Sequence, residues 1–342
     1  MSASNLDHTN LNSADVGGVV REEVMDKIWQ LDNWKLPFTE MCSKGTHGNQ
    51  KIEYTTDEYA DSVDTNAVID GSDIDQDDSK VGVRVANYTQ TAVKSVQVST
   101  RANASNSIGR QGSLSYQVAH RQKELRRDVE TQMVSAQASV QGDGTAVAGV
   151  SAGLGAWIET NTVGGIGFAA GGFNTSTSVI DAPTFGTPRA ISETDLKDIM
   201  MAIYQEGGEG IWLMARPEVI RIISEYFFTD TAKAAAMVND DTNGNGKMTA
   251  YTSSNVIVTD FGTLTLLPNR QQGLSAADAS TAYILDPKYL KQSFMTGYRV
   301  ESLGKTGLSE KRLMSVDYSL CVLNEKSQGA IFDIDHTAGM VA

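Results

Sequence analysis

Carboxylate and amide side chains that could ligate a metal ion are concentrated in two turn-like stretches of the sequence. The first, residues 241–246 (DTNGNG), matches the first half of a calcium-binding loop, in which alternate side chains supply oxygen ligands. The acid that would close this loop falls on Thr252, which cannot bind calcium in a bidentate manner. Because Asn and Gly tolerate positive φ, the stretch favours an ordinary turn.

The second stretch is the acidic series of residues 73–78, whose aspartates also have ligand spacing. It lacks the glycine that a calcium loop needs at its sixth position, and Arg84 stands where the closing acid should be. We therefore expect a solvated acidic loop and no metal site. A calcium- or glycan-binding surface module, built on these Asp and Asn turns, stays open as the alternative function.

Motifs for nucleotide binding and for catalysis are incomplete in this chain. In the glycine-rich run 164–172, Ala170 replaces the third glycine of a dinucleotide-binding loop. Lys247 lacks the upstream glycine of a phosphate-binding loop, and the four histidines have no zinc-site spacing. We predict that the protein is not an enzyme and has no catalytic residue, cofactor or metal. A hydrolase with its site in the glycine-rich segment is a weaker alternative.

Composition limits the class of partner. The chain has 342 residues and a formal net charge of −14, which argues against nonspecific binding to nucleic acid because phosphate contacts need a basic face. No apolar run approaches the roughly 18 residues of a membrane span, and residues 1–18 do not have the pattern of a secretory signal. Cys42 and Cys321 lie far apart and are expected to be free thiols.

A long amphipathic helix is the main element that the sequence predicts. Within residues 109–141, apolar side chains recur at spacings of three, four and seven from Leu114 onwards, and no Gly or Pro interrupts residues 114–141. Such a helix would be about 42 Å long at about 1.5 Å per residue. One narrow apolar stripe indicates a rod that lies on a sheet, with Val118, Leu125 and Val129 buried.

Other patterns surround this helix and give the α+β fold class. Residues 20–31 predict a short amphipathic helix, and residues 51–59 and 81–100 predict two strands of a long hairpin that has too little apolar material for a core of its own. Ser192 and Asp195 have the spacing of a helix-capping pair, a buried strand follows at 211–215, and Pro217 opens another helix. Strands dominate the remainder, at 255–261, 263–268, 281–286, 293–303, 312–324 and 329–334.

Ten collinear segments of the chain resemble one known family over nearly its whole length. They are LPF (36–38), KIEYTTDEYA (51–60), RVANYTQ (84–90), VSTRANASNSIGR (98–110), YQVAHRQKELRRDVE (116–130), LGAWIETN (154–161), RAISETDL (189–196), VTDFGTLTLLPNR (258–270), LGKTGLSEKR (303–312) and DYSLCVLNEKSQGAI (317–331). On these segments the chain resembles the major capsid proteins of tailed bacteriophages, of the Hong Kong 97-like fold. More narrowly, it is similar to a family of phage head proteins long catalogued as a domain of unknown function.

The resemblance implies a four-part organisation. We expect an N-terminal arm at 1–46, a hairpin called the E-loop at 47–108, a peripheral domain with a long spine helix at 109–142 and 281–326, and an axial domain at 143–280 and 327–342. The hairpin, which has no core of its own, would then lie over a neighbouring subunit.

The function that the resemblance implies is structural. The chain would self-assemble into hexamers and pentamers of an icosahedral phage head that encloses double-stranded DNA without sequence-specific binding, and we expect no covalent crosslink. Implied partners are a portal, a separate scaffolding protein and a decoration protein, with no membrane partner. The protein would reside in the virion after assembly in the host cytoplasm.

We expect contacts between subunits to join acidic residues of the hairpin to basic residues of the spine helix. The acidic set consists of Asp57, Glu58, Asp61, Asp64, Asp73 and Asp75. The basic set consists of Arg110, Arg121, Lys123, Arg126 and Arg127.

Overall fold

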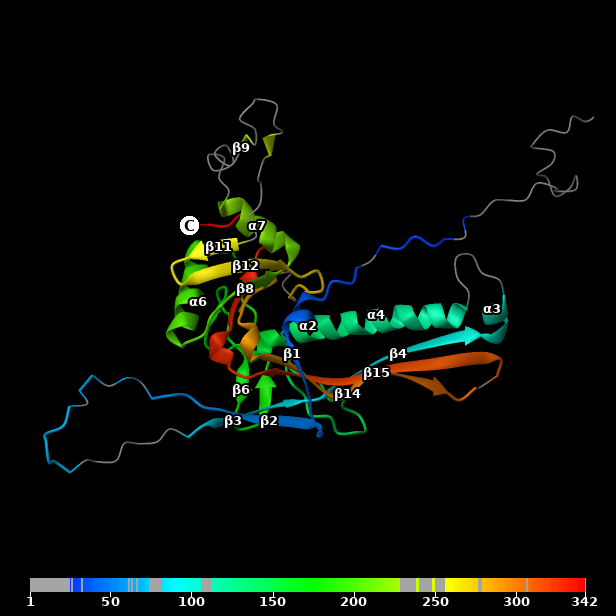
Figure 1. Cartoon of the computed structure of the whole chain (residues 1–342), viewed down its shortest axis with the longest axis horizontal. Coiled ribbons are helices and arrows are strands. Elements are labelled where there is room, and N and C mark those ends of the chain that lie inside the picture. Colours follow the sequence, from blue (N-terminus) through cyan, green and yellow to red (C-terminus); the bar gives the residue numbers. More distant parts are fainter. Residues whose placement is uncertain are drawn as a thin grey trace, which may run out of the picture.

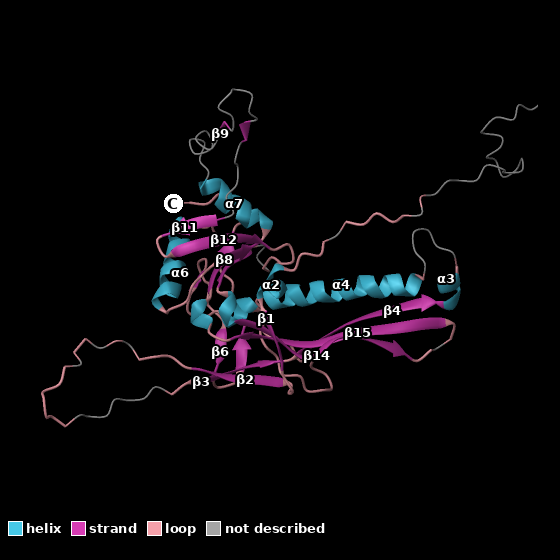
Figure 2. Ribbon diagram, in the orientation of Figure 1, coloured by secondary structure: helices cyan, strands magenta, loops and turns pink. Residues whose placement is uncertain are grey.

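Two sheets and one long helix organise the computed structural model of the chain (Figure 1). The structure describes residues 25, 27–31, 33–60, 62, 64–65, 67–73, 81–105, 112–227, 238–239, 248–249, 256–275, 279–305 and 307–341. One sheet runs beneath the long helix α4 (Ser113–Val134). The other sheet packs with two further helices, α6 (Glu193–Gln205) and α7 (Pro217–Phe227), and together they form the globular half of the molecule (Figure 2). In the described residues, no helix is both long enough and apolar enough to cross a membrane.

The sheet beneath α4 has four strands in the order β1-β14-β15-β4. Their bounds are β1 Ser43–Thr46, β14 Leu290–Leu303, β15 Ser309–Val322 and β4 Gln90–Ser99. β14 and β15 form a long antiparallel pair, β4 joins β15 antiparallel, and β1 lies parallel to β14. The short helix α3 (Thr100–Ala104) follows β4 and leads towards the start of α4.

The predicted long helix is confirmed, but it ends seven residues earlier than expected. Leu125 and Val129 are fully buried, and Val118 is partly buried against the same core. After Val134 the chain becomes extended, because its backbone groups bond to other segments: the carbonyl of Ser135 accepts from the N–H of Gly155, and Ser139 donates to the carbonyl of Ile180. These tertiary hydrogen bonds outweigh the helical periodicity of the sequence, so the prediction that the helix reaches residue 141 is wrong.

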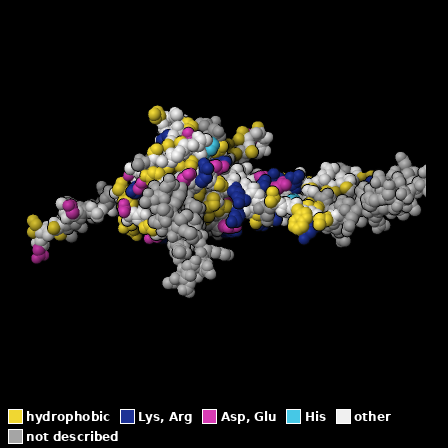
Figure 3. Space-filling view, turned by 90° about the horizontal axis from the view of Figure 1, so that it is seen from above, with side chains coloured by type: hydrophobic (Ala, Val, Ile, Leu, Met, Phe, Trp, Pro, Cys, Tyr) yellow, Lys and Arg dark blue, Asp and Glu magenta, His cyan; other side chains and the backbone are white. Residues whose placement is uncertain are grey.

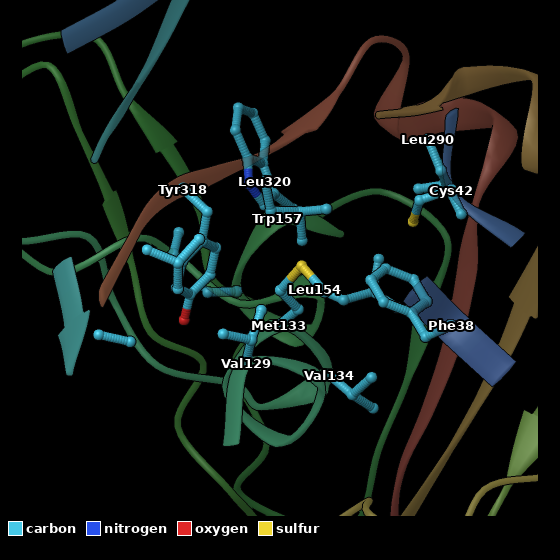
Figure 4. Close-up of a cluster of buried hydrophobic side chains, with 14 of the residues drawn as sticks. Phe38, Cys42, Val129, Met133, Val134, Leu154, Trp157, Leu290, Tyr318 and Leu320 are labelled. Atoms are coloured by element: carbon cyan, nitrogen blue, oxygen red, sulfur yellow. The ribbon is translucent and has the colours of Figure 1, made fainter. Parts of the chain in front are cut away.

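The main core lies where α4 meets the sheet (Figure 4). Val129 and Met133 of α4 pack with Tyr318 and Leu320 of β15, and with Leu154 at the start of α5. The remaining small elements of this region are α5 Leu154–Trp157, β5 Thr162–Val163, β6 Gly172–Asn174, β7 Val179–Asp181, and the 3-10 helices Pro287–Tyr289 and Glu325–Ser327. The glycine-rich tract therefore forms irregular structure with short strands, as expected.

The second sheet has six strands in the order β11-β12-β8-β13-β16-β5. Its further strands are β11 Val256–Thr259, β12 Gly262–Pro268, β8 Trp212–Ala215, β13 Ser280–Leu285 and β16 Gly329–Ile334. Side chains alternate between its faces: Leu213 joins the core under the helices of the globular half, whereas Met214 joins the core under α4. Outside both sheets, the structure also describes β9 (Val238–Asn239) paired with β10 (Met248–Thr249).

Both helices of the globular half begin where the sequence predicts. Helix α6 (Glu193–Gln205) starts with a capping box between Ser192 and Asp195, and Gly207 follows its end with a φ of +84°. Helix α7 (Pro217–Phe227) opens on its proline.

The N-terminal segment differs from its prediction. Residues 25 and 27–31 have no regular structure, so for these the predicted helix is wrong, and the rest of the prediction lies outside the described residues. Trp29 and Leu31 are exposed and contribute no buried apolar face that would stabilise a helix. The chain instead becomes regular at the short helix α2 (Pro37–Met41).

The predicted hairpin is confirmed as the antiparallel pair β2 (Lys51–Thr56) and β3 (Val83–Tyr88). The two strands lie against the body, and the chain that connects them extends from it on the side opposite to the N-terminal segment (Figure 1). The sheets cross two of the expected domain boundaries, because β4 of segment 47–108 pairs with β15, and β13 pairs with β8 and β16. The four-part division itself stays a prediction.

Candidate functional site

Among the described residues, metal-ligating side chains are not clustered. They contain no group of three or more His, Cys, Asp or Glu side chains placed to hold a metal ion. Residues 241–246 and Thr252 lie outside the described residues, and Asp73 is exposed. Both cysteines are buried, and burial raises the pKa of the Cys321 thiol to about 12, so this sulfur stays protonated and unreactive at neutral pH.

A buried polar site with four hydrogen bonds to one carboxylate lies where the N-terminal segment meets the body. Glu130 of α4 is fully buried, and its Oε1 accepts from the backbone N–H of Phe38 (2.8 Å) and from Asn269 Nδ2 (2.9 Å). Its Oε2 accepts from the N–H of Thr39 (2.7 Å) and from the Thr39 hydroxyl (2.5 Å). One carboxylate thus joins the arm, the spine helix and the end of β12.

Helix α2 explains why a carboxylate is needed there. The residue before the helix is Leu36, which has no side chain to cap the free N–H groups of the first turn. Glu130 caps them from 92 positions away in the sequence. Burial raises the pKa of Glu130, and the hydrogen bonds from Thr39, Phe38 and Asn269 offset part of that shift.

Sequence reasoning missed this site because Glu130 looked like one of the charged residues on the polar face of the helix. The available signal was a proline that opens a helix with no capping side chain before it. That pattern indicates that the free N–H groups of the first turn need an acceptor from another part of the chain, but it does not identify the residue that supplies it.

The outer face of α4 carries the described members of the predicted basic set. Arg121 pairs with Glu124 at 2.5 Å, and Lys123 and Arg126 lie over the ring of Trp34, at 5.6 and 5.7 Å from its centroid. Arg126 also lies 4.8 Å from the ring centroid of Tyr298. Arg127 is half-buried, and Arg110 lies outside the described residues. Lys123 and Arg126 therefore hold the segment around Trp34 against α4 by cation–π contacts with its ring.

The predicted acidic set lies on the projecting hairpin. Asp57, Asp64 and Asp73 are exposed, and Asp61 and Asp75 lie outside the described residues. Glu58, at the hairpin root, pairs with Lys326 at 2.9 Å, and Lys326 also reaches Glu206 at the end of α6 at 3.3 Å.

Within one chain, the described acidic and basic residues are not brought together. Figure 3 shows acidic side chains on the projecting hairpin and Lys and Arg side chains gathered nearer the middle of the molecule. The hairpin and the arm also carry large apolar side chains that touch little of their own subunit: Trp29, Leu31, Val68 and Ile69 are 75%, 96%, 65% and 82% exposed. Exposed apolar side chains of this size are typical of surfaces that bind another protein, so we expect both segments to contact a partner.

Comparison with known proteins assigns these features to a family. The model of the family described as SU10 major capsid protein matches residues 4–335. A major capsid protein of Escherichia phage Phieco32 is 34% identical over 102 residues, which cover 30% of this chain and 29% of that relative. The matched part therefore spans less than a third of the curated relative.

Solved structures match the fold over nearly the whole chain. The capsid of a native GTA particle has a TM-score of 0.56 at 11% identity and covers 94% of this chain and 98% of that one. The capsid of the cyanophage P-SCSP1u has a TM-score of 0.54 at 10% identity and covers 99% of both chains. These likenesses confirm the α+β, Hong Kong 97-like fold that the sequence resemblance implies.

Proposed function

The chain belongs to the family of SU10 major capsid proteins, and from this we propose that it builds the shell of a phage head in hexamers and pentamers that enclose double-stranded DNA. The shell forms by mutual covering of arms, and no covalent chemistry is needed. The family gives no support to the alternative of a calcium- or glycan-binding module.

One observation carries this proposal: two segments leave the body in opposite directions and leave their apolar side chains uncovered (Figure 1). A two-stranded hairpin is marginally stable alone in water. Contact with neighbouring copies supplies the missing surface for both segments. Closed symmetry then turns one such contact, repeated, into a shell.

The acidic hairpin of one subunit meets the basic outer face of α4 on its neighbour. Lys123 and Arg126 are exposed, and both sit beside Trp34, so an incoming carboxylate would meet cations that are already held in place. Exposed ion pairs contribute only about 0–1 kcal/mol each, so many must act together and high salt should weaken them. The described residues in this contact are Asp57, Glu58, Asp64, Asp73, Arg121, Lys123, Arg126 and Arg127, joined by Asp61, Asp75 and Arg110.

The four-part division fits this assembly with two adjustments. We assign β4 to the peripheral domain, because it pairs with β15 in the four-stranded sheet. We assign β13 to the axial domain, because it pairs with β8 in the six-stranded sheet. The six-stranded half would surround the symmetry axis of the capsomer, and the long helix with its sheet would form the periphery.

The net charge of −14 suits a shell that is filled with DNA, because a strongly basic wall would retain the genome during packaging. A portal, a separate scaffolding protein and a decoration protein are the further partners, and assembly takes place in the host cytoplasm.

Salt dependence tests the ionic part of this proposal. Freshly assembled shells, observed by light scattering and electron microscopy, should loosen as ionic strength rises from about 0.1 M to 1 M, because the Debye length falls from about 10 Å to 3 Å. Shells that stay unchanged over this range would remove the acidic hairpin as the main contact.

A further inference from the structure

Two Asp-Gly pairs of the chain, Asp70-Gly71 and Asp143-Gly144, hold the atoms for a reaction of the protein with itself. In such a pair the amide nitrogen of the glycine can attack the Cγ atom of the aspartate and close a succinimide ring. Glycine favours this attack because it has no Cβ and adopts many backbone conformations. Both pairs lie in the described residues, so the structure shows which of them is free to react.

Both reacting groups of Asp70-Gly71 are free. Asp70 is exposed, and among the described residues nothing bonds to its carboxyl. The pair is the centre of a β-turn in which the N–H of Ser72 donates to the carbonyl of Ile69 at 3.0 Å, whereas the N–H of Gly71 donates to no described residue. Gly71 has a φ of +80°, and no atom lies within 4 Å of the position that a Cβ would take there. The nitrogen and Cγ can therefore meet without the loss of a hydrogen bond of their own.

Asp143-Gly144 has the same chemistry but a restrained carboxyl. Asp143 Oδ1 accepts from the N–H groups of Thr145, Ala146 and Val147, each at 2.8 Å. These bonds must break before the carboxyl can turn towards the nitrogen of Gly144. They also lower the pKa of Asp143 to about 2, and the ionised carboxylate is a poor electrophile because it cannot release water.

We propose that Asp70 is a site of spontaneous isomerisation to isoaspartate and that Asp143 is protected from it. The bond from the Gly71 nitrogen to Asp70 Cγ forms while the bond from Cγ to its hydroxyl breaks, and the hydroxyl leaves as water with the amide proton. Water then adds to one of the two ring carbonyls. Opening at Cγ restores aspartate, whereas opening at the α-carbonyl leaves isoaspartate. Water is the only co-reactant, and nothing is oxidised or reduced.

Isomerisation would alter a segment to which the proposed shell function assigns a contact. The isoaspartyl linkage keeps the negative charge, but the main chain then runs through the side-chain carboxyl carbon and is one methylene longer. Asp64 and Asp73 of the acidic set lie on either side of this point, so their relative positions would shift. On the basis of the proposed shell function, a neighbour that covers the segment would restrain ring closure, and Asp70 should react more slowly after assembly.

Incubation of unassembled subunits in heavy-oxygen water at mildly acidic pH measures the reaction, because each ring opening adds one heavy oxygen atom to the peptide. Peptide mass spectrometry follows Asp70 and Asp143 in the same molecules. Uptake at Asp70 should be at least about tenfold faster, because no hydrogen bond of the carboxyl has to break first. In the urea-unfolded chain the two pairs should react at similar rates, because the restraint on Asp143 is gone.

Asp70→Glu is the control variant, since it keeps the charge but would have to close a larger ring. Uptake in this peptide should disappear, whereas uptake at Asp143 should stay the same. Equal uptake at Asp70 and Asp143 in folded subunits would overturn the proposal, and so would uptake that persists in Asp70→Glu.

The same measurement in assembled particles separates this site from the proposed function. Slower uptake at Asp70 in particles than in subunits supports coverage of the segment by a neighbour. Uptake that assembly does not change leaves the modification site in place and contradicts that coverage. A chain that reacts at Asp70 but forms no particles contradicts the shell function itself.

Discussion

Glu130 is the clearest case in which one residue determines how distant segments meet. A buried carboxylate is costly unless hydrogen bonds replace its water, and here donors from Phe38, Thr39 and Asn269 do so. The carboxylate also replaces the missing cap of α2. The chain can therefore leave the body from a fixed position at α2 although residues 25 and 27–31 have no regular structure.

Replacing Glu130 by Gln should lower the free energy of unfolding by about 1–3 kcal/mol, because the amide nitrogen would face two donors. Chemical denaturation of unassembled subunits measures this loss. Glu124→Gln, on the same helix but partly exposed and paired with Arg121, is the matched control and should change it by less than about 1 kcal/mol. Equal stability of the two variants would contradict the capping role.

Asp143 should give the loop 143–147 an acid-sensitive anchor. Its Oδ1 accepts from the N–H groups of Thr145, Ala146 and Val147, each at 2.8 Å, and these bonds lower the pKa from 3.8 to about 2. Because the pKa is depressed, the stabilisation is present above pH 3.8 and is lost as the pH falls towards 2. An NMR titration of the Asp143 carboxyl should show this low midpoint, and a midpoint near 3.8 would rule out the anchored loop.

At the scale of elements, the sequence predicted most of the fold from periodicity and capping. The stripe through Leu125 and Val129 located α4 and its buried face, and Ser192 with Asp195 located the start of α6. The end of α4 could not be predicted, because it depends on a hydrogen bond that the carbonyl of Ser135 accepts from Gly155 and on one that Ser139 donates to Ile180, and these segments are close only in space. The helix predicted at 20–31 is wrong at residues 25 and 27–31, because Trp29 and Leu31 are exposed and bury no apolar face.

Leu125→Ala should destabilise the subunit by about 2–5 kcal/mol, since it removes a side chain that is 2% exposed in the core between α4 and the sheet. Denaturant titration of unassembled subunits measures the change. Gln122→Ala, which is exposed on the same helix, should leave the free energy of unfolding within about 0.5 kcal/mol. A loss at Leu125 no larger than at Gln122 would mean that this face of α4 is not buried.

At the scale of the whole molecule, the proposed assembly depends on contacts between copies of the chain. The sequence shows which residues could take part in such contacts, but it does not show which residues of a neighbouring copy they meet. Charge patterning identified the acidic hairpin and the basic helix, but it could not show that Lys123 and Arg126 already hold Trp34.

Charge reversal of Arg126 and Arg127 to Glu should leave the subunit folded and impair assembly. The reversed residues would repel the acidic hairpin of a neighbour and would remove the contacts of Arg126 with Trp34 and Tyr298. Circular dichroism checks the fold, and light scattering measures assembly. Arg101→Glu on α3, also exposed, is the matched charge reversal and should assemble. Normal assembly of the double reversal would refute the docking of the hairpin on α4.

Electron microscopy of the purified protein tests the central claim most directly, that copies of this chain close into a shell by covering one another's arms. We predict closed icosahedral particles in which each hairpin lies on a neighbouring subunit. Particles of single subunits, with the hairpin folded back on its own body, would contradict the account.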